Sequence, residues 1–246
     1  MSKTVSTYAQ QLARWADSLA AGRSEALLAD LASGCNEADV ARYLENAMGE
    51  RRRLLLEELS FVALAFADFE QRVDQYLSET PRRTYAVTER DQERFLEWLR
   101  RDELNAQQQD FVACQAAEYG CYRLAQKNRV AHLKFQRLAS QREQRNETTN
   151  DQHKTILVNP VHVWSRLEVA ATDEHGTHSG EVVFVVVDQE IRSLWLKAAR
   201  QHAARKLTTK QQIPWAEWRN NHPQLTDDEI STLCRELIDG GLIVVC

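Results

Sequence analysis

The last third of the chain contains its strongest β-strand signal, and this signal constrains the fold most. Residues 181–188 read Glu-Val-Val-Phe-Val-Val-Val-Asp, an unbroken run of β-branched and aromatic residues between polar ends. Three consecutive valines are typical of a strand whose two faces are both covered. The first 150 residues show only helical spacing of their apolar residues. The sequence therefore predicts an α+β chain that begins with helices and ends with a small sheet and further helices.

The apolar pattern divides the chain into three segments. Residues 1–145 are predicted to form an all-helical domain, with an apolar stretch over 54–69 at its centre and a long helix over about 106–144. Residues 140–154 contain no apolar side chain, so we place a linker at 146–154. Residues 155–246 are predicted to form a second, smaller domain.

The second domain has strand signals followed by helix signals. Strands are predicted at 156–158 and 161–169, and a polar hairpin loop at 173–180 leads into the strand 181–188. Helical patterns follow over 191–200 and 227–239, and Gly240 and Gly241 end the second of these before a short apolar tail. A three-stranded antiparallel sheet followed by helices in this order is winged-helix-like. Modules of this kind bind either a nucleic acid or an extended peptide.

Charge and cysteine content exclude several classes of protein. The net charge of −5 divides into −2 over residues 1–154 and −3 over residues 155–246, so neither part has the basic excess of a duplex-binding module. Five irregularly spaced cysteines argue against a disulfide framework and favour a reducing, cytoplasmic location. The N-terminus has no secretory signal pattern, and no apolar run is long enough to cross a membrane.

Motifs for catalysis are missing from the sequence. His175 and His178 share a polar loop without a nearby cysteine, and Cys114 and Cys121 lie two helical turns apart, which favours two buried thiols over a redox pair. Glycine-rich phosphate loops and the Gly-x-Ser-x-Gly motif do not occur. We therefore expect a non-catalytic chain with no metal or cofactor of its own. An enzyme with a cryptic site around Glu118, Tyr122 and His132 stays an alternative.

The predicted long helix carries the one basic feature of the chain. No acidic residue occurs between Glu118 and Glu143, and Arg123, Lys127, Lys134 and Arg137 fall near one side of the helix. These four residues are either a solvated face or a docking surface for a protein partner, an acidic peptide or a nucleic acid.

The choice between nucleic acid and peptide depends on the last helix and on the valine-rich strand. The helix 227–239 has one arginine, Arg235, against five acids, so phosphate would repel it. An extended peptide could instead pair with an exposed edge of the strand over 182–187. Peptide binding is therefore the favoured reading, and a winged-helix DNA-binding regulator with a helical sensor domain is the alternative.

The order strand, strand, EVVFVVVDQEIRSLWLKAAR, IPWAEW and LTDDEISTLCRELIDGGLIVV resembles the PqqD-like RiPP recognition element over about residues 156–246. In that family the leader of a ribosomally made precursor peptide binds as an extra strand beside the third strand, in a cleft with the third helix. The resemblance implies peptide-binding residues at two places in this chain, which are Val183, Phe184, Val185 and Val186 on the strand and Leu233, Arg235, Glu236 and Leu237 on the helix.

The whole order, a helical domain and then this element, is similar to the partner subunits of multinuclear non-haem iron enzymes of the methanobactin type. The stretches DFVACQAAEYGCYRLAQKNRVAHLKFQRL and VNPVHVWSRLEV suggest this similarity. It implies a heterodimer in which this chain holds the precursor while an iron-dependent enzyme oxidises a core cysteine. The iron would then belong to the partner, and this chain would bind neither nucleic acid nor membrane.

Overall fold

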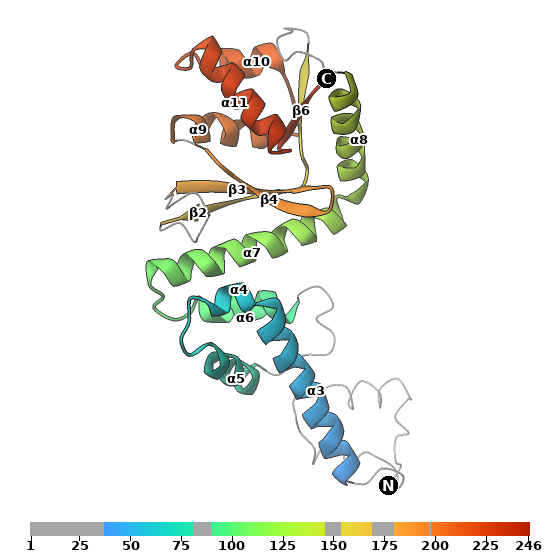
Figure 1. The fold of residues 1–246 in the computed structure, drawn as a ribbon, viewed down its shortest axis with the longest axis vertical. Helices are drawn as coiled ribbons and strands as arrows, with labels where there is room; N and C mark the ends of the chain where they lie inside the picture. The colour runs from blue at the N-terminus through green and yellow to red at the C-terminus, as the bar shows by residue number, and fades with distance from the viewer. Residues whose placement is uncertain (1–36, 81–89, 146–153, 169–179, 197) are drawn as a thin grey trace, which may run out of the picture. The chain divides into compact units, whose positions relative to one another are not determined.

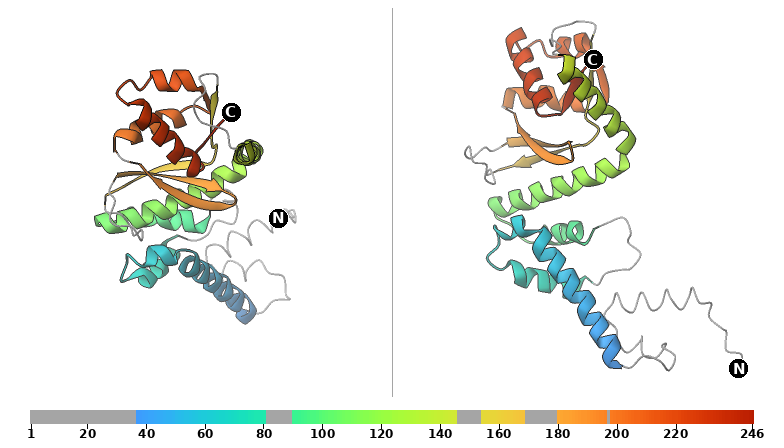
Figure 2. Two further views of the ribbon diagram at one scale, coloured as in Figure 1. Left: turned by 45° about the horizontal axis from the view of Figure 1, so that its top comes forward. Right: turned by 45° about the vertical axis from the view of Figure 1, so that its right-hand side comes forward.

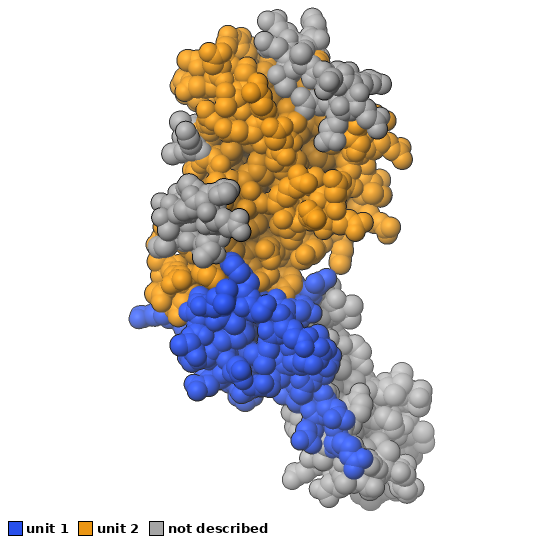
Figure 3. Space-filling model, in the orientation of Figure 1, with its two compact units in different colours: residues 1–104 blue, residues 105–246 orange. Residues whose placement is uncertain are grey.

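The computed structural model describes residues 37–80, 90–145, 154–168, 180–196 and 198–246. Contacts between residues divide the chain into two units, residues 1–104 and residues 105–246, which Figure 3 colours separately. The predicted class is confirmed, since helices come first and small antiparallel sheets with helices follow.

Unit 1 is a set of helices around an aromatic core. Its described helices are α3 (Glu37–Glu58), α4 (Ser60–Ala63), α5 (Phe69–Glu79) and α6 (Asp91–Leu99). The ring of Phe95 from α6 lies 5.1 Å from that of Tyr76 and stacks on Trp98 at 5.8 Å. Phe69 meets Phe95 edge to face, so the rings of α5 and α6 interlock. The apolar stretch 54–69 is only partly buried, because Leu64 is 76% exposed. Its buried residues lie on one stripe, which is Leu55, Leu59, Val62, Phe66 and Phe69.

Unit 2 contains two three-stranded sheets, and all of their strand pairs are antiparallel. Its elements, in chain order, are α7 (Ala106–Lys127), α8 (Arg129–Arg145), β1 (Thr155–Val158), β2 (His162–Leu167), β3 (Gly180–Val187), β4 (Glu190–Trp195), α9 (Ala198–Thr208), β5 (Gln212–Pro214), α10 (Trp215–Asn220), α11 (Asp227–Asp239) and β6 (Ile243–Val245). The strand order is β2-β3-β4 in one sheet and β5-β1-β6 in the other.

The sheet β2-β3-β4 lies between α7 on one face and the helices α9 to α11 on the other (Figures 1 and 2). Val183 and Val185 belong to the core that contains Leu233 and Leu237 of α11. The opposite face of β3 meets α7, where the thiol of Cys121 donates to the Phe184 carbonyl oxygen at 3.5 Å. The reading of the valine run as a strand covered on both faces is thus confirmed.

The second sheet is built around β1, which pairs with β5 on one side and with β6 on the other. The helix α8 lies alongside this sheet, next to β6 (Figure 1). Ile156 and Val158 are buried in the same core as α9 to α11, whereas Leu157 points to the side of α8. The sequence did not predict this second sheet, because its three strands are short and far apart in the chain.

Two helical predictions are wrong. Residues 191–200 were expected to form a helix, but β4 occupies Glu190–Trp195 and α9 begins only at Ala198. A tight turn at Asp188 and Gln189, with φ of +50° and +70°, folds the chain back so that β4 pairs with β3. The long helix expected over 106–144 is broken at Asn128, whose side-chain amide donates to the Pro160 carbonyl oxygen at 3.1 Å.

The boundary between the units differs from the predicted one. We expected a helical domain over 1–145, but α7 packs against β2 and β3, and α8 packs against β6. Contacts therefore divide the chain between Leu104 and Asn105, and both helices belong with the sheets. Residues 146–153, which make up most of the predicted linker, lie outside the described residues. Residues 1–36 of the predicted helical domain also lie outside them.

Candidate functional site

The strand that was predicted to capture a peptide has no open edge. Residues 180–185 of β3 pair with β2, and residues 182–187 pair with β4. The four predicted contact residues on this strand, Val183, Phe184, Val185 and Val186, are all buried. The prediction that a peptide adds to this strand is therefore wrong, because both sets of its backbone groups already serve the sheet.

The strand β4 is an edge of its sheet, since it pairs with β3 alone among the described strands. The Val186 N–H donates to the Val161 carbonyl oxygen at 3.3 Å, so even-numbered residues of β3 direct their backbone groups toward β2. Odd-numbered residues then face β4, where the register joins Val185 to Arg192. By the same alternation, the backbone groups of Ile191 and Ser193 point to the outer edge of β4.

The four predicted peptide contacts on the last helix lie on different sides of α11. Leu233 and Leu237 are fully buried and belong to the core, so they do not form a binding surface. Arg235 is exposed on the side away from this core. Glu236 is half-buried and forms an ion pair with Arg200 of α9.

The flank of α11 that carries Glu236 is the one next to β4. Gly240 lies one turn further along this flank, and a Cβ atom at Gly240 would stand only 1.9 Å from the side chain of Leu194. The helix end and the edge strand therefore touch at this point. Glu236 shares the flank of Gly240, and Leu233 and Leu237 belong to the core that also contains Leu194 of β4. Sequence reasoning missed Ile191 and Ser193 because it assigned them to a helix.

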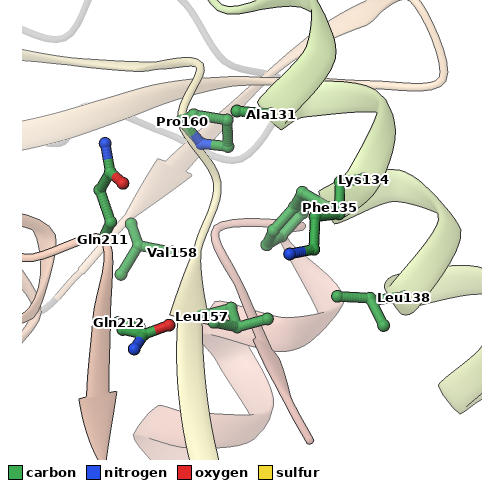
Figure 4. A pocket seen from close by; sticks show the side chains of 9 residues that line it. All are labelled: Ala131, Lys134, Phe135, Leu138, Leu157, Val158, Pro160, Gln211 and Gln212. Atoms are coloured by element: carbon green, nitrogen blue, oxygen red, sulfur yellow. The ribbon is translucent and has the colours of Figure 1, made fainter.

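The basic residues predicted for partner docking lie on two helices. Arg123 and Lys127 belong to α7, Lys134 and Arg137 belong to α8, and all four are exposed. A cavity of about 200 Å³ opens beside Lys134, between one face of α8, residues 157–160 and the glutamines Gln211 and Gln212 (Figure 4).

Buried polar groups of unit 2 meet at the turn between β1 and β2. Asn159 is fully buried, and its side-chain amide donates to the carbonyl oxygens of Val186 and Gly241 at 3.0 Å each. Its side-chain oxygen accepts the Val161 N–H at 2.9 Å. The His162 ring donates from Nδ1 to the Asn159 carbonyl oxygen at 2.7 Å, because a carbonyl can only accept. Asn159 thus ties the turn between β1 and β2 to β3 and to the turn between α11 and β6.

The residues considered for catalysis make contacts that are typical of a structural role. Burial raises the pKa of the Cys114 and Cys121 thiols to about 12, so both are protonated and unreactive at neutral pH. Burial also raises the pKa of Glu118, which accepts a hydrogen bond from the Gln115 amide at 2.7 Å. His132 is buried with its Nε2 atom 3.1 Å from the Val186 carbonyl oxygen.

His175 and His178 lie outside the described residues. Within the part of the chain that the structure describes, no cluster of three or more His, Cys, Asp or Glu side chains could hold a metal ion. Over the same residues, no helix is both long enough and apolar enough to pass through a membrane. No protein-family model, curated protein or solved structure matches this chain.

Proposed function

We propose that this chain is a non-catalytic peptide-binding subunit, which captures an extended peptide as a fourth strand on the outer edge of β4. The observation that carries the proposal is the strand order β2-β3-β4, which leaves the backbone groups of Ile191 and Ser193 directed outward. An added strand would satisfy these groups and extend the sheet by main-chain hydrogen bonds. Glu236 of α11 lies one turn before Gly240, which meets Leu194 of β4, and we propose that it contributes to the selection of side chains.

The peptide is proposed to be the leader of a ribosomally made precursor. This part rests on the resemblance of the segment 156–246 to the PqqD-like recognition element, with β4 in place of β3 as the strand that receives the leader. The strand that leads into the first helix of the module is β4, and the last helix is α11, as the resemblance requires. This order of β4 and the helices supports the proposal that the leader binds at β4.

The partner is proposed to be an iron-dependent oxidase of the methanobactin type, to which this chain presents the core cysteine of the precursor. The complex would be a heterodimer in the cytoplasm, and the iron would belong to the enzyme. The buried, protonated cysteines of this chain suit a reducing compartment. The presentation role needs no reactive group of this chain, so its own cysteines and histidines are not part of the proposed chemistry.

A DNA-binding regulator is the weaker proposal. The segment from α9 to β6 has the element order of a winged helix, in which α11 would enter the major groove. The first turn of α11 exposes Asp227, Asp228 and Glu229, and these carboxylates would face the phosphates. Electrostatic repulsion at the contact helix is opposite to what tight binding of duplex DNA needs.

The test uses fluorescein-labelled synthetic peptides that cover the small open reading frames beside the gene of this protein. We expect one of them to bind the full chain saturably in fluorescence anisotropy. Ser193→Pro removes an outward N–H from an edge strand, where proline is tolerated, and should weaken this binding at least about tenfold. Ser193→Ala keeps the N–H and should bind as the unaltered chain does.

Two results would reject the proposal. One is that none of these peptides binds, and the other is that a folded Ser193→Pro variant binds its peptide with unchanged affinity. Binding of labelled genomic DNA fragments that weakens steeply between 50 and 200 mM salt would support the regulator instead.

A further inference from the structure

The outer face of α8 is both apolar and basic. Val130 is 83% exposed and Leu133 is 56% exposed, although both are large apolar side chains. They lie three residues apart, and Arg137 continues the same stripe four residues later. Lys134 borders this stripe, and both cations are exposed. We name Val130, Leu133, Lys134 and Arg137 the α8 face.

The region around the α8 face has a positive net charge, whereas the whole chain has a negative one. Residues 119–142 contain six Lys and Arg and no Asp or Glu, whereas the whole chain has a net charge of −5. Within the described residues, neither Lys134 nor Arg137 forms an ion pair, in contrast to Arg52 and Arg53 of α3, which contact carboxylates of their own unit. No ion pair among the described residues therefore neutralises the positive charge of the α8 face.

A cavity with both apolar and polar lining residues adjoins the α8 face. Phe135 and Leu138 reach from α8 toward Leu157 of β1, and Lys134 lies at the same wall (Figure 4). The volume of about 200 Å³ is below that of sites for drug-sized ligands, and it suits a single apolar side chain. A hole of this size beside exposed apolar residues is the usual setting of an anchor residue in a protein interface.

We propose that the α8 face and this cavity dock an acidic segment of a partner protein that inserts one apolar side chain between Phe135 and Leu157. Carboxylates of the segment pair with Lys134 and Arg137, and its apolar side covers Val130 and Leu133. The proposal rests on the proposed function in taking this partner to be the modifying enzyme. A nucleic acid fits less well, because phosphates would use the cations but leave Val130, Leu133 and the cavity exposed to water.

The surface is separate from the peptide edge, since it shares no residue with β4 or α11. A phage-displayed library of random 12-residue peptides, selected on the full chain at 50 mM salt, tests it without knowledge of the partner. We expect enriched peptides that carry Asp and Glu around one Leu, Phe or Trp. The double variant Lys134→Glu/Arg137→Glu should weaken their binding at least about tenfold, and 300 mM salt should weaken it further.

Three further variants complete the test. Leu133→Asp should weaken the same peptides, and Ala131→Phe should do so by filling the mouth of the cavity without a change of charge. Arg100→Glu/Arg101→Glu, at two exposed arginines of unit 1, carries the same change of charge as the double variant and should leave binding unchanged. Ser193→Pro should also leave these peptides bound, so loss of the β4 site and loss of the α8 site are observed separately.

Four outcomes would overturn the proposal. They are enriched peptides without acidic bias, binding that survives Lys134→Glu/Arg137→Glu, a 20-base-pair DNA duplex that competes with the peptides for this face, and concentration-dependent dimers of the chain that Leu133→Asp abolishes. The last two would assign the face to a nucleic acid or to a second copy. Circular dichroism of each variant confirms that a loss of binding is not a loss of the fold.

Discussion

Asp91 of α6 receives the guanidinium of Arg51 of α3 with both of its carboxylate oxygens, at 2.6 and 2.9 Å. The Arg51 side chain is only 7% exposed and that of Asp91 14%, so the pair is largely removed from water. The Tyr76 hydroxyl donates to the same carboxylate at 2.7 Å, and burial together with this bond raises the pKa of Tyr76. One carboxylate thus joins α3, α5 and α6.

Arg51→Ala is expected to destabilise unit 1 by about 3–5 kcal/mol, because it leaves the Asp91 carboxylate buried without its partner. Arg52→Ala is the matched control, since Arg52 contacts Glu70 and Asp74 at the surface. Exposed pairs of this kind contribute less than about 1 kcal/mol. Hydrogen exchange of the amides of α5 and α6 measures both losses, and equal losses for the two arginines would contradict the interpretation.

Asn159→Ala is expected to destabilise unit 2 by about 2–4 kcal/mol, since it strands the Val161 N–H and removes a donor from two buried carbonyl oxygens. Asn159→Asp should be worse at neutral pH, because its carboxylate would face those two oxygens, and should recover at low pH when it is protonated. Asn128→Ala, which loses one hydrogen bond, is the control and should cost about 1 kcal/mol. Urea unfolding followed by circular dichroism measures all three.

Stability should fall as the pH is lowered below about 6.5, and His162 should contribute to this fall. Burial lowers the pKa of His162, so the unfolded chain takes up a proton at a higher pH than the folded chain does. The stabilisation from neutral His162 is therefore complete above the unfolded pKa and is lost as the pH falls toward the folded pKa. His162→Asn keeps a donor near the position of Nδ1 and removes the titration.

Urea midpoints between pH 7.5 and 5.5 provide the measurement, and His162→Asn should flatten the curve. Burial also lowers the pKa of His222, so that residue contributes in the same direction and some slope should remain. An unchanged slope in His162→Asn would show that the ring is already accessible to protons in the folded chain.

Gly241→Ala is expected to cost about 2–3 kcal/mol for two separate reasons. Gly241 has φ of +76°, a conformation that an alanine adopts only with strain, and a Cβ atom there would lie 2.2 Å from a methyl group of Val187. Adding Val187→Ala should remove the clash but not the strain. The double variant should therefore lose less stability than the sum of the single variants, and strict additivity would contradict the proposed contact.

The parts of unit 2 that the sequence predicted are those set by local signals. Thr226 and Glu229 form a capping box at the start of α11, and the helix ends where Gly240 follows. The predicted bounds 227–239 match the observed helix for this reason. The sequence signal for the strand 181–188 was equally clear, because a strand that is buried on both faces carries apolar residues at successive positions.

The parts that the sequence missed depend on distant contacts. The turn at Asp188 and Gln189 places two non-glycine residues at positive φ, so no Asn-Gly signal marked the start of β4. Apolar spacing showed that α7 has a buried face, but it could not show that β2 and β3 cover it. Because the sequence did not predict the hairpin, it placed the candidate peptide-binding edge on β3. In the structure β4 covers that edge of β3 and is the candidate in its place.

The placement of β1 between β5 and β6 has a consequence for synthesis of the chain. Ile156 pairs with Val245, and Leu157 pairs with both Gln212 and Val244. The ribosome therefore completes β1 well before it makes the two strands that pair with β1. A nascent chain that ends before Ile243 leaves one side of β1 open, and a fragment that begins at α9 lacks the strand that β5 and β6 share. During synthesis the pairing of β6 with β1 must therefore wait for the last residues of the chain, and this pairing is non-local in sequence.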